Sequence, residues 1–152
     1  MIRKALVIGI DDYPYNPLNG CINDAGAVKS VLERNGDGSP NFDVRLITES
    51  NEAGKSSLKR LVRELFNTES DIALLYYAGH GMITPTGGFI VTPDGQDDDE
   101  GISMDEILKM ANDSRASSKM IIMDCCYAGS FGDSKYNENI SYICKELNII
   151  AA

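Results

Sequence analysis

The chain has 152 residues, the length of a single domain able to bury one core. Its 14 Lys and Arg against 23 Asp and Glu give a net charge of -9, which disfavours nucleic acid as a partner because phosphate binding needs clustered cations. A hydrophobic fraction of 43% is that of a folded globular protein and excludes a disordered one.

The first predicted element is a buried parallel strand over Lys4–Ile10. Its residues are apolar and β-branched, and a loop with Asp11, Asp12 and two prolines follows. The apolar stretch Ala5–Ile10 is too short for a signal peptide or a membrane span. We therefore expect a cytoplasmic protein with no membrane partner.

A helix and a second strand come next. Apolar residues at helical spacing predict a helix that begins at Asn23 or Asp24 and ends near Arg34, before an Asn-Gly pair. Alternation of apolar and polar residues over Asn41–Thr48 predicts a strand nearer the edge of a sheet.

The middle of the chain repeats this order. Leu58–Phe66 has the spacing of an amphipathic helix, and the nearly continuous apolar run Asp71–Ala78 predicts a central strand. Phe89–Thr92 suggests a small hairpin arm, and the acidic stretch Asp94–Glu100 is predicted to be a loop.

A third helix is predicted over Ile102–Met110. Ser103 is its expected N-cap, and Glu106 three residues later completes a capping box. The apolar run Lys119–Cys125 then predicts a fourth strand.

The end of the chain adds a short helix over Ile140–Leu147 and the opening of a fifth strand at Asn148–Ala152. Strands that alternate with helices imply a mostly parallel sheet covered on both faces. Functional groups of such sheets gather in the loops at the carboxyl ends of the strands.

Two candidate catalytic side chains lie in such loops. His80 is the single histidine and stands between Gly79 and Gly81, and Cys126 follows the fourth strand 46 residues later. A histidine next to a cysteine can generate the thiolate nucleophile, and the Gly81 N–H could point at a developing oxyanion. The competing interpretation is that the cysteine is a small core residue and the histidine a polar surface group.

The cysteines give no sign of a metal centre. No two of them form a C-x-x-C pair, and one histidine cannot build a multi-histidine site, so no metal cofactor is expected. In a reducing compartment they are expected to be thiols. Apart from Cys126, structural roles are expected for the cysteines, namely Cys21, Cys125 and Cys144.

The segments Ala78–Gly81 and Asp124–Gly129 resemble the Ser-Gly-His-Gly and Asp-Ser-Cys-His-Ser-Gly segments of caspase-like cysteine peptidases, in particular metacaspases and their bacterial relatives. The resemblance extends from LVIGIDDYP through LNGCINDA to LNIIAA. It implies an α/β fold, a three-layer sandwich with a mostly parallel central sheet over residues 1–152. It also implies a cysteine endopeptidase with Cys126 as nucleophile, His80 as acid and base, and the N–H groups of Gly81 and Cys126 as oxyanion hole.

The same resemblance implies a substrate pocket. Metacaspases have two carboxylates there, matched here by Asp24 and Asp124, and two carboxylates favour a basic side chain. We therefore expect a protein or peptide substrate that is cleaved after Arg or Lys. Cys21 and Ala78 complete the expected pocket, where Ala78 stands in place of a serine; the competing role for Asp24 is to cap a helix.

Two further expectations follow from the family. Some metacaspases need calcium, but Asp97–Glu100 lacks the periodicity of a ligand set, so a solvated acidic loop is favoured and no cofactor is expected. Family members continue into a small subunit. Residues 148–152 are therefore interpreted as the start of its strand, in a sheet missing its last strands, which another segment or a partner chain would complete.

Two other functions remain as alternatives. A catalytically silent caspase-like scaffold could bind partners through its sheet edge or acidic face, although intact His80 and Cys126 argue against it. A flavodoxin-like nucleotide-binding domain would need a Gly-rich phosphate loop after the first strand, where Asp11 and Asp12 would repel phosphate.

Overall fold

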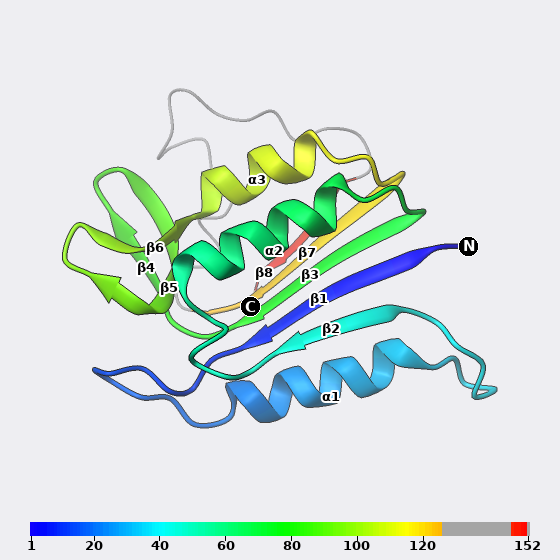
Figure 1. Cartoon of the computed structure of the whole chain (residues 1–152), viewed down its shortest axis with the longest axis horizontal. Helices are drawn as coiled ribbons and strands as arrows, with labels where there is room; N and C mark the ends of the chain where they lie inside the picture. Colours follow the sequence, from blue (N-terminus) through cyan, green and yellow to red (C-terminus); the bar gives the residue numbers. More distant parts are fainter. Residues whose placement is uncertain (126–146, 152) are drawn as a thin grey trace.

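A computed structural model describes residues 1–125 and 147–151. Within these ranges a five-stranded parallel sheet has the order β2-β1-β3-β7-β8, with α1 on one face and α2 and α3 on the other (Figure 1). The predicted three-layer α/β architecture is thereby confirmed. The elements are β1 (Arg3–Gly9), α1 (Cys21–Glu33), β2 (Asp43–Ile47), α2 (Lys55–Asn67), β3 (Ile72–Ala78), β4 (Gly81–Thr84), β5 (Gly87–Gln96), β6 (Asp99–Ser103), α3 (Met104–Asn112), β7 (Ser118–Asp124) and β8 (Leu147–Ala151).

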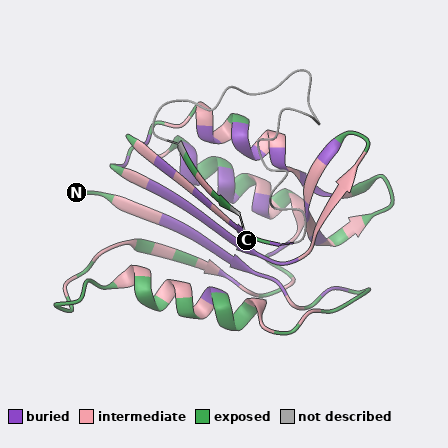
Figure 2. Ribbon diagram, turned by 180° about the vertical axis from the view of Figure 1, so that it is seen from behind, coloured by how far each residue is buried: buried purple, intermediate pink, exposed green. Residues whose placement is uncertain are grey.

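The sheet separates two apolar cores. Successive side chains of β1 point to opposite faces, so that Leu6 and Ile8 belong to the core under α2 and α3, whereas Ala5 and Val7 belong to the core under α1. Figure 2 shows β1 and β3 buried over most of their length, as their continuous apolar runs predict. β3 is central and β2 lies at an edge, both as predicted.

Helix α2 shows why the amphipathic prediction was correct. Its apolar residues all face the core. A residue of β5 caps its N-terminus: the Lys55 N–H donates to both carboxylate oxygens of Asp94, at 2.9 and 3.1 Å. Gly54, at the N-cap position, has no side chain that could do this. The buried residues of α2 are Leu58, Leu61, Val62, Leu65 and Phe66.

Helix α1 begins at Cys21, two to three residues before the start predicted at Asn23 or Asp24. The carboxylate of Asp11, in the loop after β1, accepts hydrogen bonds from the N–H groups of Gly20, Cys21 and Ile22, at 3.2, 2.9 and 3.3 Å. These are N–H groups that a helix leaves unpaired at its start. The cap from Asp11 therefore lets the helix begin at Cys21, before the residues whose apolar spacing predicted it.

The prediction of a loop at Asp94–Glu100 was wrong. β5 continues to Gln96 and β6 begins at Asp99, so the acidic stretch forms a hairpin in a small antiparallel sheet, β4-β5-β6. Pro93 cannot donate to the ladder, and the register of β5 against β6 shifts between Val91 and Gln96. β5 pairs with β6 again beyond this irregularity, but in the sequence Pro93 indicates the end of a strand.

Helix α3 begins at Met104, so Ser103 does occupy the predicted N-cap position, but its side chain makes no capping hydrogen bond. Glu106 forms an ion pair with Lys59 of α2 instead, at 2.6 Å. Ile102, predicted to be helical, is the fully buried penultimate residue of β6. The ion pair between helices thus replaces the expected capping box.

The predicted fifth strand is present as β8, which pairs in parallel with β7. Leu147 begins this strand and is not the end of a helix; the rest of the predicted helix, residues 140–146, lies outside the described residues. Across the described ranges, no helix is long and apolar enough to cross a bilayer.

Candidate active site

The register of the central strands brings the two candidate loops to the same edge of the sheet. Ala78 of β3 pairs with Asp124 of β7, and the Gly79 N–H donates to the Asp124 carbonyl at 3.4 Å. His80 follows Ala78 by two residues, and Cys126 follows Asp124 by two residues. Cys126 itself lies outside the described residues, whereas Cys125 before it is buried.

The imidazole of His80 is fixed by a backbone carbonyl. Its Nε2 lies 2.6 Å from the carbonyl oxygen of Asn16, in the loop after β1. A carbonyl oxygen only accepts hydrogen bonds, so Nε2 is the donor in this contact and Nδ1 is the ring nitrogen that the contact leaves unused. Asn16 has a φ of 58°, a left-handed conformation that asparagine tolerates well.

Two tyrosines fix the rest of His80. Its backbone N–H donates to the Tyr13 hydroxyl at 3.0 Å, and its carbonyl accepts from the Tyr77 hydroxyl at 2.7 Å. The Tyr13 ring also packs on the imidazole, with ring centres 4.6 Å apart. Burial raises the pKa of Tyr13 to about 12, so this phenol keeps its proton, and with it its donor function, further into the alkaline range than an exposed tyrosine does.

Sequence reasoning missed Tyr13, Tyr77 and Asn16. Tyr77 lies in the apolar run of a central strand, Tyr13 belongs to the LVIGIDDYP segment, and Asn16 follows that segment, but no local pattern links these residues to His80. The one available signal is that a buried tyrosine hydroxyl needs a polar partner. The identity of that partner depends on the pairing of distant strands.

Gly81 is the first residue of β4 and pairs with Ile90 of β5. The Val91 N–H donates to the His80 carbonyl at 2.9 Å. His80 and Val91, one position before Gly81 and Ile90, therefore form a hydrogen-bonded pair. Hydrogen-bonded and non-hydrogen-bonded pairs alternate in an antiparallel ladder, so the Gly81 N–H is directed away from β5. The ladder between β4 and β5 therefore does not use this N–H group.

The predicted pocket residues lie on the α1 side of the sheet. Ala78 is buried there beside Tyr76, whose hydroxyl donates to Asp124 at 3.4 Å. Burial, followed by the charges of Asp124 and Asp24, raises the pKa of Tyr76 to about 12. The charges of Asp24 and Asp124 therefore both act on the Tyr76 hydroxyl.

The environment of Cys21 also shows that the charges of Asp24 and Asp124 act on the α1 side of the sheet. Burial, its hydrogen bond to Asp11, and the charges of Asp11, Asp124 and Asp24 raise the pKa of its thiol to about 11. Such a thiol stays protonated at neutral pH, as expected for a structural cysteine. Asp24 is exposed in the first turn of α1, and the capping role considered for it belongs to Asp11.

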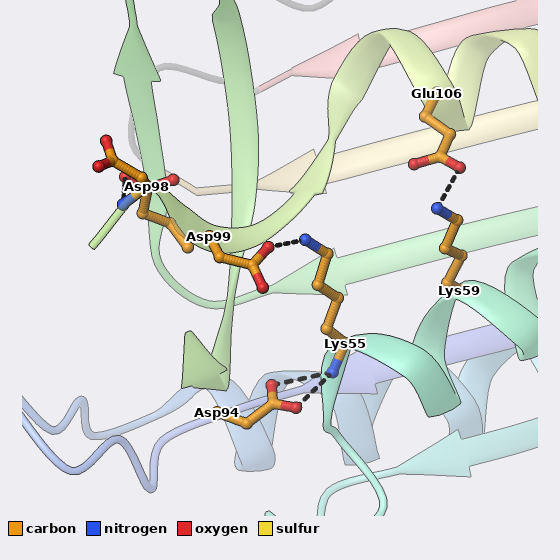
Figure 3. Close-up of polar contacts among 7 residues, drawn as sticks. Lys55, Lys59, Asp94, Asp98, Asp99 and Glu106 are labelled. Carbon is orange, nitrogen blue, oxygen red and sulfur yellow. Dashed lines mark hydrogen bonds and ion pairs between the residues drawn. The ribbon is translucent and has the colours of Figure 1, made fainter. Parts of the chain in front are cut away.

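The acidic hairpin is joined to the start of α2 by one ion pair and by the backbone hydrogen bonds from Lys55 to Asp94 (Figure 3). The Lys55 ammonium pairs with Asp99, and the Asp98 N–H donates to Glu100 at 3.2 Å. In the described part of the chain, no group of three or more His, Cys, Asp or Glu side chains is arranged to hold a metal ion. The hairpin thus already has a cationic partner within the chain.

Comparison with known proteins identifies the family of the chain. Residues 2–148 match the family model described as the caspase domain, Peptidase_C14. A similar protein is Metacaspase-9 of Arabidopsis thaliana, which is 32% identical over 98 residues, 57% of this chain. The matched part spans 30% of that relative's length.

Proposed function

The chain belongs to the caspase-domain family of peptidases, and on this premise we propose that it is a cysteine endopeptidase cleaving protein substrates after Arg or Lys. The observation that carries the proposal is the anchoring of His80. Its ring is fixed at the carboxyl end of β3, next to β7, the strand that leads to Cys126. A histidine fixed beside a cysteine is the minimum a thiolate peptidase needs.

The proposed reaction has two stages. His80 Nδ1 takes the proton of the Cys126 thiol, and the thiolate attacks the scissile carbonyl carbon, while the N–H groups of Gly81 and Cys126 bind the oxyanion. The imidazolium then protonates the leaving amine as the C–N bond breaks and a thioester forms. Water loses a proton to His80 and hydrolyses the thioester, which releases the acid and regenerates the thiol.

The electrostatics of the pocket support a basic residue at the cleavage site. Asp24 and Asp124 are both exposed, and both raise the pKa of Tyr76, so the negative potential of the pocket is the sum of two carboxylates. A guanidinium or ammonium entering it would be paired with charge of opposite sign. An acidic side chain would be repelled.

Three further expectations belong to this proposal. We propose that catalysis uses no metal cofactor, since Lys55 already pairs with the acidic hairpin; equal activity in EDTA and in calcium is the expected result. The protein is proposed to be cytoplasmic. Another segment or a partner chain, such as a small subunit, is proposed to pair with β8, whose outer edge has no neighbouring strand among the described residues.

Labelling with a peptidyl-Arg acyloxymethyl ketone, followed by fragment mass spectrometry, tests the proposal. We expect one adduct on Cys126 and none in Cys126→Ala, together with turnover of Arg and Lys substrates but not Asp substrates. Cys125 is the internal control, because it is the adjacent thiol and is buried. A folded wild-type protein with no adduct would favour the silent scaffold.

A further inference from the structure

We propose that Tyr13 and Tyr77 are positioning residues for His80, whose paired hydroxyls fix the loop that presents the imidazole. The inference rests on the proposed function only in taking His80 as the acid and base. Their hydroxyls lie 3.2 Å apart at the carboxyl end of the sheet, and both tyrosines are buried, with 5% and 0% of their surface exposed. Neither is part of the reaction proposed above.

The hydrogen-bonding capacity of the two phenols matches the backbone groups around them. The two hydroxyl groups have two protons to donate to two backbone carbonyls. The Tyr77 hydroxyl lies 2.7 Å from the His80 carbonyl oxygen and 2.9 Å from the Val91 carbonyl oxygen. The Tyr13 hydroxyl lies 3.3 Å from the Val91 carbonyl oxygen. Tyr13 also accepts the His80 N–H. Each backbone group thereby has a partner next to two buried tyrosine side chains.

The two tyrosines are not equivalent in this arrangement. Without the Tyr77 hydroxyl, the His80 carbonyl keeps the Val91 N–H and the Val91 carbonyl keeps the Tyr13 hydroxyl. Without the Tyr13 hydroxyl, the His80 N–H loses the acceptor it has in this structure. A donor left unsatisfied is the more costly defect, so loss of the Tyr13 hydroxyl should disturb His80 more than loss of the Tyr77 hydroxyl.

Gly79 explains why the pair fits. A Cβ atom at this position would lie 2.6 Å from the Tyr13 hydroxyl and 2.7 Å from that of Tyr77. Gly79 lacks the positive φ that would require glycine, so the requirement is for space and not for backbone conformation. The glycine before His80 therefore makes room for the two hydroxyls.

Tyr13 and Asn16 belong to the same loop after β1. This loop contacts His80 at its backbone N–H, at its ring through the tilted Tyr13 ring, and at Nε2. Loss of the Tyr13 hydroxyl should therefore change the orientation of the ring relative to Asn16, and with it the population of the Nε2–H tautomer.

The first experiment needs no activity. His80 is the single histidine, so long-range ¹H–¹⁵N spectra contain one imidazole. In wild type we expect the Nε2–H tautomer. In Tyr13→Phe we expect both ring ¹⁵N shifts to move toward a mixture of tautomers, with a smaller change in Tyr77→Phe. Tyr15→Phe is the matched control, because Tyr15 lies in the same loop and is 86% exposed.

The second experiment measures kinetics with an Arg substrate. Misorientation of the base should lower kcat about tenfold in Tyr13→Phe and less in Tyr77→Phe, while KM stays the same, because the pocket lies on the other face of the sheet. Gly79→Ala should reproduce the kcat loss while keeping both hydroxyls. Tyr15→Phe should match wild type.

Folded Tyr13→Phe and Tyr77→Phe with wild-type imidazole shifts would overturn the inference, as would an equal change in Tyr15→Phe. If Tyr13→Phe does not fold, the shifts of Tyr77→Phe decide. If wild type shows no peptidase activity but the imidazole shifts change in the expected order, the positioning role stands and the proposed function fails.

Discussion

Replacement of Asp11 by alanine should destabilise the protein by about 2 kcal/mol. The carboxylate accepts three N–H bonds at the start of α1, and the loss of an N-cap costs about 0.5–2 kcal/mol, with about 0.3–1 kcal/mol more for a charge at the helix N-terminus. Asp11 is half-buried, so water still partly screens its charge and the hydrogen bonds dominate. At this chain length, the melting temperature should fall by about 4–8 °C.

The matched control is Asp12→Ala. Asp12 is the neighbouring residue, carries the same charge and is exposed, so its removal should leave the melting temperature within about 1 °C of wild type. Thermal unfolding of the three proteins, followed by circular dichroism at equal ionic strength, is the assay. Equal melting temperatures for Asp11→Ala and Asp12→Ala would refute the capping role.

The pH dependence gives an independent check. Burial raises the pKa of Asp11, but its bonds to the N–H groups of Ile22, Gly20 and Cys21 outweigh this and lower it below the usual value. A carboxyl with a lowered pKa stabilises the fold above its unfolded pKa, near 3.9, and loses this contribution as the pH falls through the folded value. The gap between wild type and Asp11→Ala should be full at pH 7 and narrow below about pH 4. A gap that stays constant down to pH 3 would contradict the assignment.

Three further predictions concern the pocket and the core. Asp124→Asn should raise KM for an Arg substrate about tenfold and leave kcat nearly unchanged, as steady-state kinetics would show. Gly9→Ala should cost about 1–3 kcal/mol in urea unfolding, since its Cβ would lie 2.3 Å from the Cys21 carbonyl oxygen and 2.6 Å from the Ala25 Cβ; wild-type stability would contradict that close approach. Ser70→Ala should leave stability unchanged or raise it by up to about 1 kcal/mol, because its buried hydroxyl has no partner among the described residues; a clear loss in the same assay would indicate one.

The parallel strands were predicted well because their residues are almost all apolar, which indicates burial on both faces. Continuous apolar runs at β1 and β3 require cover on both faces, and only a parallel sheet between helix layers supplies it. β5 was predicted poorly because Pro93 is a local signal for the end of a strand. Its pairing with β6 on both sides of the irregularity overrides that signal.

The candidate site divides in the same way. His80 and Cys126 were proposed from their residue types and their places after two strands, whereas Asp24 and Asp124 were proposed only from the resemblance to metacaspases. The partners of His80 were not found, because each contact joins residues distant in sequence. Asn16 contributes a backbone carbonyl, which any residue type possesses.

The sequence by itself predicted the alternation of the parallel strands with the helices, the central place of β3 and the candidate loops at the carboxyl ends of the strands. These depend on hydrophobic periodicity and on residues adjacent in the chain. Tertiary structure alone decided where α1 begins, how the imidazole of His80 is oriented and why Gly79 is glycine. Each of these depends on a side chain or carbonyl from the loop after β1, and only the pairing of β1 with β3 brings that loop to its partners.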